Sequence, residues 1–286
     1  MTKARVALVT DSTAYIPKAV CEQLGIHIVP NVVNWSGKSY RDGVDIGAVE
    51  FFERLKVDPV APTTSVASLG EMKEVYAAAA SAAEAVIGVH LSAKLSNTFK
   101  VAQEAAALLP DKPIRVFDAE TTAMAMGYIV VLAARAAAAG QSAEQVGQLI
   151  TTAVPRTGVV LTVETLKYLQ RGGRIGAAAA FAAGVLDLKP LLEVRDGMIH
   201  PLERVRSRKK AMARLVEIVC ERLAGKSQIR LATLHAAAEA EATEILAAAQ
   251  ARLGGAVVET VVTDVSPTVA THTGPGTIGL AYLEGV

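Results

Sequence analysis

The 286-residue sequence predicts an α/β protein with two domains, on three observations. Short β-branched runs alternate with helical patterns along the first half, which is typical of a parallel sheet flanked by helices. Pro155 then interrupts the last of these helical patterns. Beyond it, Asp196-Gly197 lies between two apolar runs, a strong signal for a β-hairpin. We therefore expect an N-terminal parallel-sheet α/β/α domain over residues 1–156 and an α+β domain over residues 157–286.

The elements of the first half follow from their residue patterns. Pro17 suits the first turn of a helix, and Gly25 suits a helix stop. The predicted strands are short β-branched runs: Arg5–Asp11, Ile26–Asn34, Ala85–Leu91 and Ile114–Asp118. The predicted helices have longer patterns: Pro17–Leu24, Gly47–Lys56, Leu69–Ala83, Ser96–Leu109, Thr121–Ala139 and Ala143–Val154.

The second half has a different pattern, with mixed strands and a hairpin. Beside the two strands that flank Asp196-Gly197, the predicted strands are Gly158–Val163, Ile229–His235, Val257–Val265 and Thr277–Leu283. The predicted helices are Glu164–Gln170, Ser207–Leu223 and Ala238–Leu253. This mixture favours α+β packing over a second doubly wound sheet.

Composition excludes some classes of partner. The 29 Lys and Arg nearly balance the 28 Asp and Glu, and no helix-turn-helix, zinc-knuckle or RNA-recognition motif is present. Neither a nucleic-acid partner nor a transcription regulator is therefore expected. Cys21 and Cys220 lack a C-x-x-C partner and are expected to be core residues of a reduced protein. The five His and two Cys show no metal-ligand spacing, so we expect no metal.

The sequence also predicts a cytoplasmic location. Its first residues, MTKARVALVTDST, lead directly into a strand and lack the apolar stretch and cleavage site of a signal peptide. The most apolar run, Ala123–Ala134, is too short to span a bilayer and is followed by Arg135.

Near the C-terminus, the stretch THTGPGTIGLAY spells G-x-G-x-x-G without forming a dinucleotide site. That fingerprint joins a strand to a helix, and the seven residues after Gly279 are too few for a helix and a second strand. Pro275 between two glycines instead predicts a tight turn that fixes His272. Neighbouring hydroxyls would be held with it, on Thr268, Thr271 and Thr273. Taken alone, His272 is equally open to a structural and a functional role.

Polar residues follow several predicted strands, where open α/β sheets bind ligands. Asp11 ends the first strand, but Thr13 stands where an aspartyl phosphatase needs a second carboxylate, so we expect Asp11 to order the loop or cap a helix. Two further loops, PTTSVAS and HLSAKLSNT, are rich in hydroxyl and amide groups: Thr63, Thr64, Ser65, Ser68, Ser92, Ser96, Asn97 and Thr98. Each loop alone can be explained by helix capping, whereas together they predict an anion site. No G-x-S-x-G serine-hydrolase motif is present.

The run GAAAAFAAGVL, Gly176–Leu186, is apolar throughout, and its small side chains leave space. It fits the wall of a lipid tunnel, but composition alone favours a close-packed core helix. A sixteen-carbon chain would gain on the order of 10 kcal/mol, at about 0.8 kcal/mol for each buried methylene. Its carboxylate would then require hydroxyl, N–H or charged imidazole donors.

Several motifs, taken in order, resemble the DegV family of bacterial fatty-acid-binding proteins nearly from end to end. They are VTDSTAYIP, YRDGVDI, TTSVASLGEM, LSAKLSNTF, LKYLQRGGRIG, LDLKPLLEVRDGMIHPLERVRSRKKAM and HTGPGTIGLAY. The resemblance implies a long-chain fatty acid in a tunnel of the second domain, with its carboxylate at the domain interface. It also implies carboxylate contacts from Thr64, Ser65, Ser96 and His272.

The same resemblance implies a carrier that performs no chemistry itself and needs no cofactor beyond the bound fatty acid. A separate ATP-dependent fatty-acid kinase phosphorylates the carboxylate, and transient membrane contact allows lipid exchange. Arg174 and Arg206 are implied to serve the phosphorylated head group or the kinase. "RGGRIG" places Arg174 beside glycines, and "ERVRSRKK" places Arg206 in a basic cluster at a helix start, where cations are unfavourable unless an anion docks.

This chain departs from the family pattern at a few positions. Ala67 stands where proline is usual, and Asn97 stands where glycine is usual; asparagine tolerates left-handed backbone and is expected to narrow the head-group pocket. Further departures are Ala119, Ala125 and Arg204. The alternative function is a stand-alone hydrolase or phosphotransferase that uses Asp11, Ser96 and His272.

Overall fold

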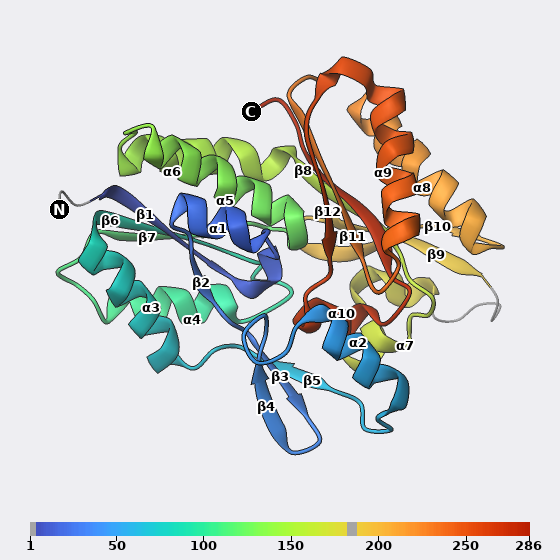
Figure 1. Cartoon of the computed structure of the whole chain (residues 1–286), viewed down its shortest axis with the longest axis horizontal. Coiled ribbons are helices and arrows are strands. Elements are labelled where there is room, and N and C mark those ends of the chain that lie inside the picture. The colour runs from blue at the N-terminus through green and yellow to red at the C-terminus, as the bar shows by residue number, and fades with distance from the viewer. Residues whose placement is uncertain (1–3, 182–187) are drawn as a thin grey trace.

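The first sheet of the protein is the predicted parallel one. The computed structural model describes residues 4–181 and 188–286 (Figure 1). Four parallel strands pair in the order β2-β1-β6-β7. Their bounds are β1 (Ala4–Asp11), β2 (His27–Val29), β6 (Ala83–His90) and β7 (Ile114–Asp118).

Helices cover both faces of this sheet, as the alternation of its side chains requires. Val9 and Val86 pack with α3 (Leu69–Ala82) and α4 (Thr98–Ala107) on one face. Leu8 and Ile87 point to the other face, towards α1, α5 and α6. The bounds of those three helices are Lys18–Leu24, Ala123–Ala138 and Ala143–Ala153. The predicted α/β/α arrangement of the first half is thus confirmed.

The second half forms a six-stranded mixed sheet in the order β10-β9-β8-β13-β11-β12. Its strands are β8 (Thr157–Thr162), β9 (Lys189–Arg195), β10 (Met198–Val205), β11 (Ile229–His235), β12 (Val257–Asp264) and β13 (Ile278–Leu283). Only β11 and β12 run parallel within this sheet. The helices α8 (Arg208–Leu223) and α9 (Glu239–Leu253) cover its outer face. The predicted hairpin around Asp196-Gly197 is confirmed as β9–β10.

Helix α5 lies between the two sheets and is nearly surrounded by protein. Its sequence, AMAMGYIVVLAARAAA, is almost entirely apolar up to the exposed Arg135 in its last turn, which suits a helix with little solvent-exposed surface. It contacts β1 and β6 of one sheet and β8, β11 and β13 of the other. The hydroxyl of Tyr128 donates to the Leu231 carbonyl at 2.7 Å and so ties α5 to β11. Helix α5 therefore fixes how the two sheets sit together.

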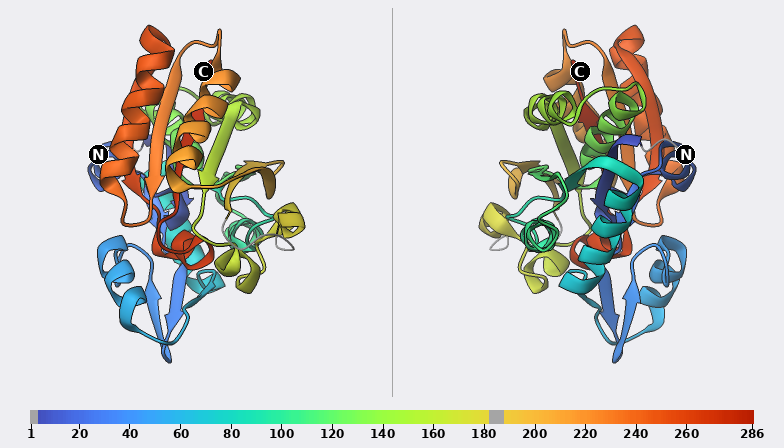
Figure 2. Two further views of the ribbon diagram at one scale, coloured as in Figure 1. Left: turned by 90° about the vertical axis from the view of Figure 1, so that its right-hand side faces the viewer. Right: turned by 90° about the vertical axis from the view of Figure 1, so that its left-hand side faces the viewer.

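A small antiparallel sheet projects from this body (Figures 1 and 2). It has the order β4-β3-β5, with β3 (Val32–Trp35), β4 (Lys38–Arg41) and β5 (Thr63–Ser65), and α2 (Ala48–Val57) beside it. The prediction of one strand over Ile26–Asn34 is wrong, because the chain leaves the parallel sheet at Pro30 and pairs elsewhere. The ladder between β1 and β2 ends where Asp11, the last residue of β1, faces Val29, so β2 has no partner beyond this point. The short strands β4 and β5 were not predicted.

Of two short helices, α10 (Pro267–Thr273) contacts β3 and β5 of this projection, and α7 (Lys167–Arg171) packs against α10. The predicted tight turn at Pro275 is present, but the placement of His272 in that Gly/Pro loop is wrong, because His272 lies before it in the last turn of α10. Ser266 caps this helix by accepting from the Val269 N–H at 3.1 Å, Pro267 occupies its first turn, and Gly274 ends it at a φ of 79°. These are ordinary start and stop signals for a helix.

The remaining expectations concern the small apolar run, the two cysteines and the domain boundary. A 3-10 helix covers Gly176–Phe181, the first part of the small apolar run, whereas residues 182–187 lie outside the described part of the chain. Cys21 and Cys220 are buried, as expected. A 3-10 turn ends at Arg156 and β8 begins at Thr157, but the division into domains at this point stays a prediction.

Gly279 shows what the third glycine of the G-x-G-x-x-G pattern does. It lies in β13, opposite Leu161 of β8 on one side and Leu234 of β11 on the other. A Cβ atom there would lie 2.7 Å from the Val160 carbonyl oxygen and 2.9 Å from the Leu161 Cβ. The strand therefore requires glycine for space and not for phosphate binding.

We expect Gly279→Ala to lower the free energy of unfolding by about 1–3 kcal/mol, because the added methyl overpacks the centre of the sheet. Urea denaturation measures the change. Gly255→Ala is the matched control, since a Cβ there meets no atom within 4 Å, and it should change stability by less than about 0.5 kcal/mol. Equal stabilities of the two variants would contradict the packing explanation.

Candidate functional site

A cavity of about 330 Å³ lies where the carboxyl ends of the parallel strands meet the inner face of the six-stranded sheet. This volume is at the lower end of the range of small-molecule sites. Its apolar lining residues are Leu91, Leu95, Val159, Leu161, Leu169, Val194, Ile199, Leu234 and Val269. Its polar lining residues are Thr13, Asn31, Thr64, Ser65, Ser96, Asn97, Arg174, Thr268 and His272. The cavity thus combines an apolar wall with a polar cluster.

The apolar wall is a product of strand register. Val194 of β9 pairs with Val159 on one side and with Ile199 on the other, so these three form one row across the sheet. Directly opposed residues of antiparallel strands point to the same face. In a second row, Leu161 and Leu234 flank Gly279. Both rows face the cavity with branched aliphatic side chains that suit a hydrocarbon chain.

His272 and Thr64 meet at the polar side of the cavity, although 208 residues separate them. Helix α10 supplies the imidazole and β5 the hydroxyl, and His272 Nε2 lies 2.8 Å from Thr64 Oγ1. Burial, followed by the charges of Arg174 and Arg171, lowers the pKa of His272 to about 4. The imidazole is therefore neutral at pH 7, and the charged form considered from the sequence is not the one present.

Gly172 and Arg174 complete this side of the cavity. A Cβ on Gly172 would overlap the His272 Nδ1 atom, so the imidazole packs directly on the backbone of the RGGR turn. Arg174 Nε donates to the Leu95 carbonyl at 3.0 Å, and its Nη1 donates to the Gly172 carbonyl at 2.6 Å. These bonds hold a guanidinium charge at the cavity wall.

The other predicted head-group residues lie at the same cavity with different orientations. Ser96 Oγ lies 2.8 Å from Thr98 Oγ1 and accepts from the Thr98 N–H at 3.2 Å. Ser65 follows Thr64 in β5, and its Oγ accepts from Asn34 Nδ2 at 3.1 Å on an exposed face. Asn97 lines the cavity at a φ of −77°, so the left-handed backbone that asparagine tolerates is not used.

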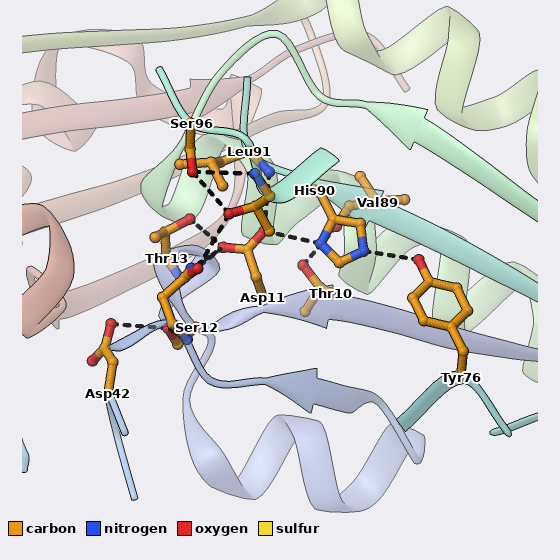
Figure 3. A network of polar contacts seen from close by, with 12 residues as sticks. Thr10, Asp11, Ser12, Thr13, Asp42, Tyr76, Val89, His90, Leu91 and Ser96 are labelled. Carbon is orange, nitrogen blue, oxygen red and sulfur yellow. Dashed lines mark hydrogen bonds and ion pairs between the residues drawn. The ribbon is translucent and has the colours of Figure 1, made fainter. Parts of the chain in front are cut away.

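Asp11 organises the loops around this cluster (Figure 3). Its side chain is fully buried. Oδ1 accepts from the N–H of Thr13 at 3.0 Å, from the Thr13 hydroxyl at 2.5 Å and from Asn31 Nδ2 at 3.3 Å. Oδ2 accepts from the Leu91 N–H at 3.0 Å. The expectation that Asp11 orders its loop is confirmed.

His90 and Tyr76 extend this network and were not found from the sequence. His90 Nδ1 lies 3.1 Å from Asp11 Oδ2, and its Nε2 lies 2.8 Å from the Tyr76 hydroxyl. A carboxylate accepts only, so Nδ1 donates to it, and Nε2 forms the hydrogen bond with the Tyr76 hydroxyl. Burial raises the pKa of Tyr76, which keeps the phenol protonated. All three side chains are fully buried and therefore support the site without touching a ligand.

The residues of the alternative enzyme do not form a linked triad. In the described part of the chain, Asp11 pairs with His90, Ser96 with Thr98 and His272 with Thr64, and no hydrogen bond joins the first members of these pairs to one another. A nucleophilic serine requires a base within hydrogen-bond reach. The arrangement of Asp11, Ser96 and His272 therefore does not activate Ser96 as a nucleophile.

Arg206 is separated from the cavity. It is exposed between β10 and α8, and it does not occur among the described residues that line the cavity. Its neighbour Arg208 donates to Glu241 at 2.8 Å and to Glu164 at 2.6 Å, and the guanidinium of Arg204 lies 4.4 Å from the Phe181 ring centroid. The positive charge at the start of α8 is thus partly balanced within the protein.

Comparison with known proteins identifies the family of this protein. The DegV family model, described as "Uncharacterised protein, DegV family", matches residues 5–285. The protein belongs to the DegV family.

Relatives match over the full length. A DegV domain-containing protein of Streptomyces coelicolor is 38% identical, over 96% of this chain and 97% of its own. The structure of a fatty-acid-binding DegV family protein from Thermus thermophilus is 34% identical with a TM-score of 0.93, over 98% of this chain and 100% of the other. A stearic acid-binding protein from Eubacterium ventriosum is 26% identical with a TM-score of 0.90, over 98% of each chain.

Residues 4–181 and 188–286 contain neither a candidate membrane-spanning helix nor a candidate metal site. No helix there is both long and apolar enough to cross a bilayer. No group of three or more His, Cys, Asp or Glu in the same residues is placed to hold a metal ion.

The pKa of His272 gives a pH-dependent prediction. Between pH 6.5, the ordinary value, and about pH 4, the unfolded chain binds a proton at this residue that the folded chain does not. His272 therefore leaves stability unchanged above pH 6.5 and lowers it as the pH falls towards 4. We expect its imidazole NMR resonances to titrate near pH 4, and His272→Gln to reduce the loss of stability over this interval. A His272 midpoint near 6.5 would contradict the burial argument.

Proposed function

We propose that this protein binds a long-chain fatty acid, with the hydrocarbon chain on the apolar wall of the cavity and the carboxylate at Thr64, Ser96 and His272. The single observation that carries the proposal is the cavity itself, where the two aliphatic rows of the six-stranded sheet adjoin a cluster of hydroxyl, imidazole and guanidinium groups. The Thermus and Eubacterium structures, whose proteins bind fatty acids, support the same ligand class.

The polar cluster suits a carboxylate because it offers donors without a large desolvation cost. The hydroxyls of Thr64 and Ser96 can rotate to donate, and a neutral imidazole donates through one ring nitrogen. Arg174 supplies positive charge at the wall without leaving its carbonyl partners. Ser65 lies at the same edge, where its hydroxyl can turn from Asn34 to the ligand. A buried carboxylate then gains charge-assisted bonds instead of remaining unpaired.

The role that we propose is that of a carrier. The protein presents the carboxylate to a separate fatty-acid kinase, which transfers phosphate from ATP and forms an acyl-phosphate. Two features support this division of labour: the cavity lacks a linked nucleophile and base among the described residues, and Arg206 is exposed beside the basic start of α8. An exposed arginine can form forked bonds to a phosphate or to acidic groups of a partner.

We expect the purified protein to release close to one equivalent of a long-chain fatty acid on denaturation, since the aliphatic wall retains the hydrocarbon chain. Mass spectrometry of the extracted lipid measures this. Preparations without lipid, together with absence of palmitate binding after delipidation, would refute the proposal.

Variants of the delipidated protein locate the carboxylate. Ser96→Ala and His272→Ala should each weaken palmitate binding by about 1–3 kcal/mol, the cost of a lost buried hydrogen bond. Ser81→Ala is the control, because Ser81 is exposed on α3 and donates to the Ala78 carbonyl away from the cavity. Unchanged affinity in both site variants, with the fold intact, would place the carboxylate elsewhere.

Variants of Arg174 and Arg206 distinguish fatty-acid binding from presentation of the carboxylate to the kinase. Arg206→Ala should keep palmitate binding and slow phosphorylation by an added fatty-acid kinase, and Arg206→Lys should restore only part of the rate because lysine lacks the forked donor. Arg174→Ala should likewise impair phosphorylation more than binding. Lys112→Ala, which removes an exposed charge before β7, is the control. Normal phosphorylation by both arginine variants would reject this role, and loss of palmitate binding in both would assign them to the carboxylate.

A further inference from the structure

A second cavity, of about 750 Å³, lies beyond the loop that follows β1. Ser12 and Asp42 line this second cavity, whereas Thr13 and Thr268 line the first. Its other walls come from α1, β2 and the carboxyl ends of β11 and β12. The proposed fatty-acid site therefore does not use it, although the two cavities are separated by a single layer of residues.

Two buried polar side chains in this second cavity have atoms without partners. Asp42 is 1% exposed and His235 is 5% exposed. Within residues 4–181 and 188–286, Asp42 Oδ1 and His235 Nδ1 have no hydrogen-bond partner. The other oxygen, Asp42 Oδ2, accepts from the Ser12 hydroxyl at 2.9 Å and from the Thr268 N–H at 3.4 Å, and the hydroxyls of Thr268 and Ser266 also stabilise the carboxylate. A buried polar atom without a partner is costly, so Asp42 Oδ1 is the place where a hydrogen-bond donor would gain most.

The charge around these atoms is negative. Asp264 ends β12, and its Oδ1 lies 3.4 Å from His235 Nδ1. Burial, followed by the charges of Asp42 and Asp264, raises the pKa of Tyr15 to about 12, so this phenol stays neutral. Burial raises the pKa of Asp42 to about 6, and the group is mainly a carboxylate at pH 7.5.

The rim of the second cavity does not neutralise this charge. Lys18 is the only Lys or Arg among its described lining residues, and it is exposed and pairs with Glu22 at 3.7 Å. Burial lowers the pKa of His27, which keeps that imidazole neutral. Glu239, at the start of α9, adds a further carboxylate. Asp42 and Asp264 therefore face the cavity without a nearby lysine or arginine of their own.

We propose that the second cavity binds a small organic ammonium ion, with its nitrogen at Asp42 and Asp264 and its carbon chain on the apolar wall. That wall consists of Ile16, Pro17, Ile26, Ile28, Pro30 and Val262. An ammonium group supplies three donors and a positive charge, which match the unpartnered Oδ1 of Asp42 and the partly exposed carboxylate of Asp264. An organic cation fits better than a metal ion, because no metal-binding group of three side chains occurs in the described residues and much of the wall is aliphatic.

Putrescine tests this assignment by isothermal titration calorimetry on the full chain at pH 7.5. Putrescine should bind with the same affinity to protein as purified and to protein incubated with palmitate, because the two cavities are distinct. Butane-1,4-diol, which has the same length without charge, should not bind. Loss of putrescine binding after palmitate addition, equal binding of the diol, or no binding of putrescine would each overturn the proposal.

Variants locate the bound amine. Asp264→Asn should raise the Kd for putrescine at least tenfold, since it removes the half-exposed carboxylate without touching the bonds that Asp42 makes to Ser12 and α10. Asp111→Asn, which removes an exposed carboxylate before β7, should leave the Kd unchanged. Circular dichroism checks that both variants fold. Tyr15→Phe is a second variant in the same cavity, and it removes only one hydroxyl group. Equal affinities of Asp264→Asn and Asp111→Asn would refute the site.

Discussion

The buried carboxylate of Asp11 is the interaction on which the site depends. It binds groups from three separate segments: the turn after β1, Asn31 beyond β2, and the end of β6 at His90 and Leu91. Ionised carboxylates are tolerated inside proteins only where donors satisfy them, and here each oxygen has at least two. The loops that present Thr13 and Ser96 leave from these same points. The buried charge of Asp11 thus sets the positions of loop side chains that make few contacts of their own.

The second constraint is that two sheets share one helix. Helix α5 is buried along most of its length, so its apolar residues contact both sheets and hold them at a fixed spacing. The parallel sheet then presents loops, and the mixed sheet presents the flat side of its strands. A polar cluster beside an aliphatic wall follows from this geometry, because strand ends carry polar turns and strand faces carry branched side chains.

Periodicity in the sequence predicted most of the fold, because burial on one or two faces leaves a regular pattern in β6, β11 and α8. Periodicity did not predict β4 and β5, because these short strands depend on pairing with β3. It also did not predict the break at Pro30, which divides a run that looks continuous in the sequence. At the site, the hydroxyl loops and His272 were visible as residue types. The link between His90, Tyr76 and Asp11 was not, because a histidine at the end of an apolar strand carries no mark of the carboxylate on its neighbour.

The distance along the chain between Thr64 and His272 has a consequence for biosynthesis. At about 5–20 residues per second, a ribosome needs roughly 10–40 s to add the 208 residues between them. During this interval the parallel sheet can form, but the imidazole that faces Thr64 has not yet been synthesised. Strand β13, which joins β8 to β11 in the six-stranded sheet, follows α10 in the chain. Neither the complete aliphatic wall nor the pair of His272 and Thr64 can therefore form before the C-terminal residues are made, so completion of the cavity coincides with completion of the chain.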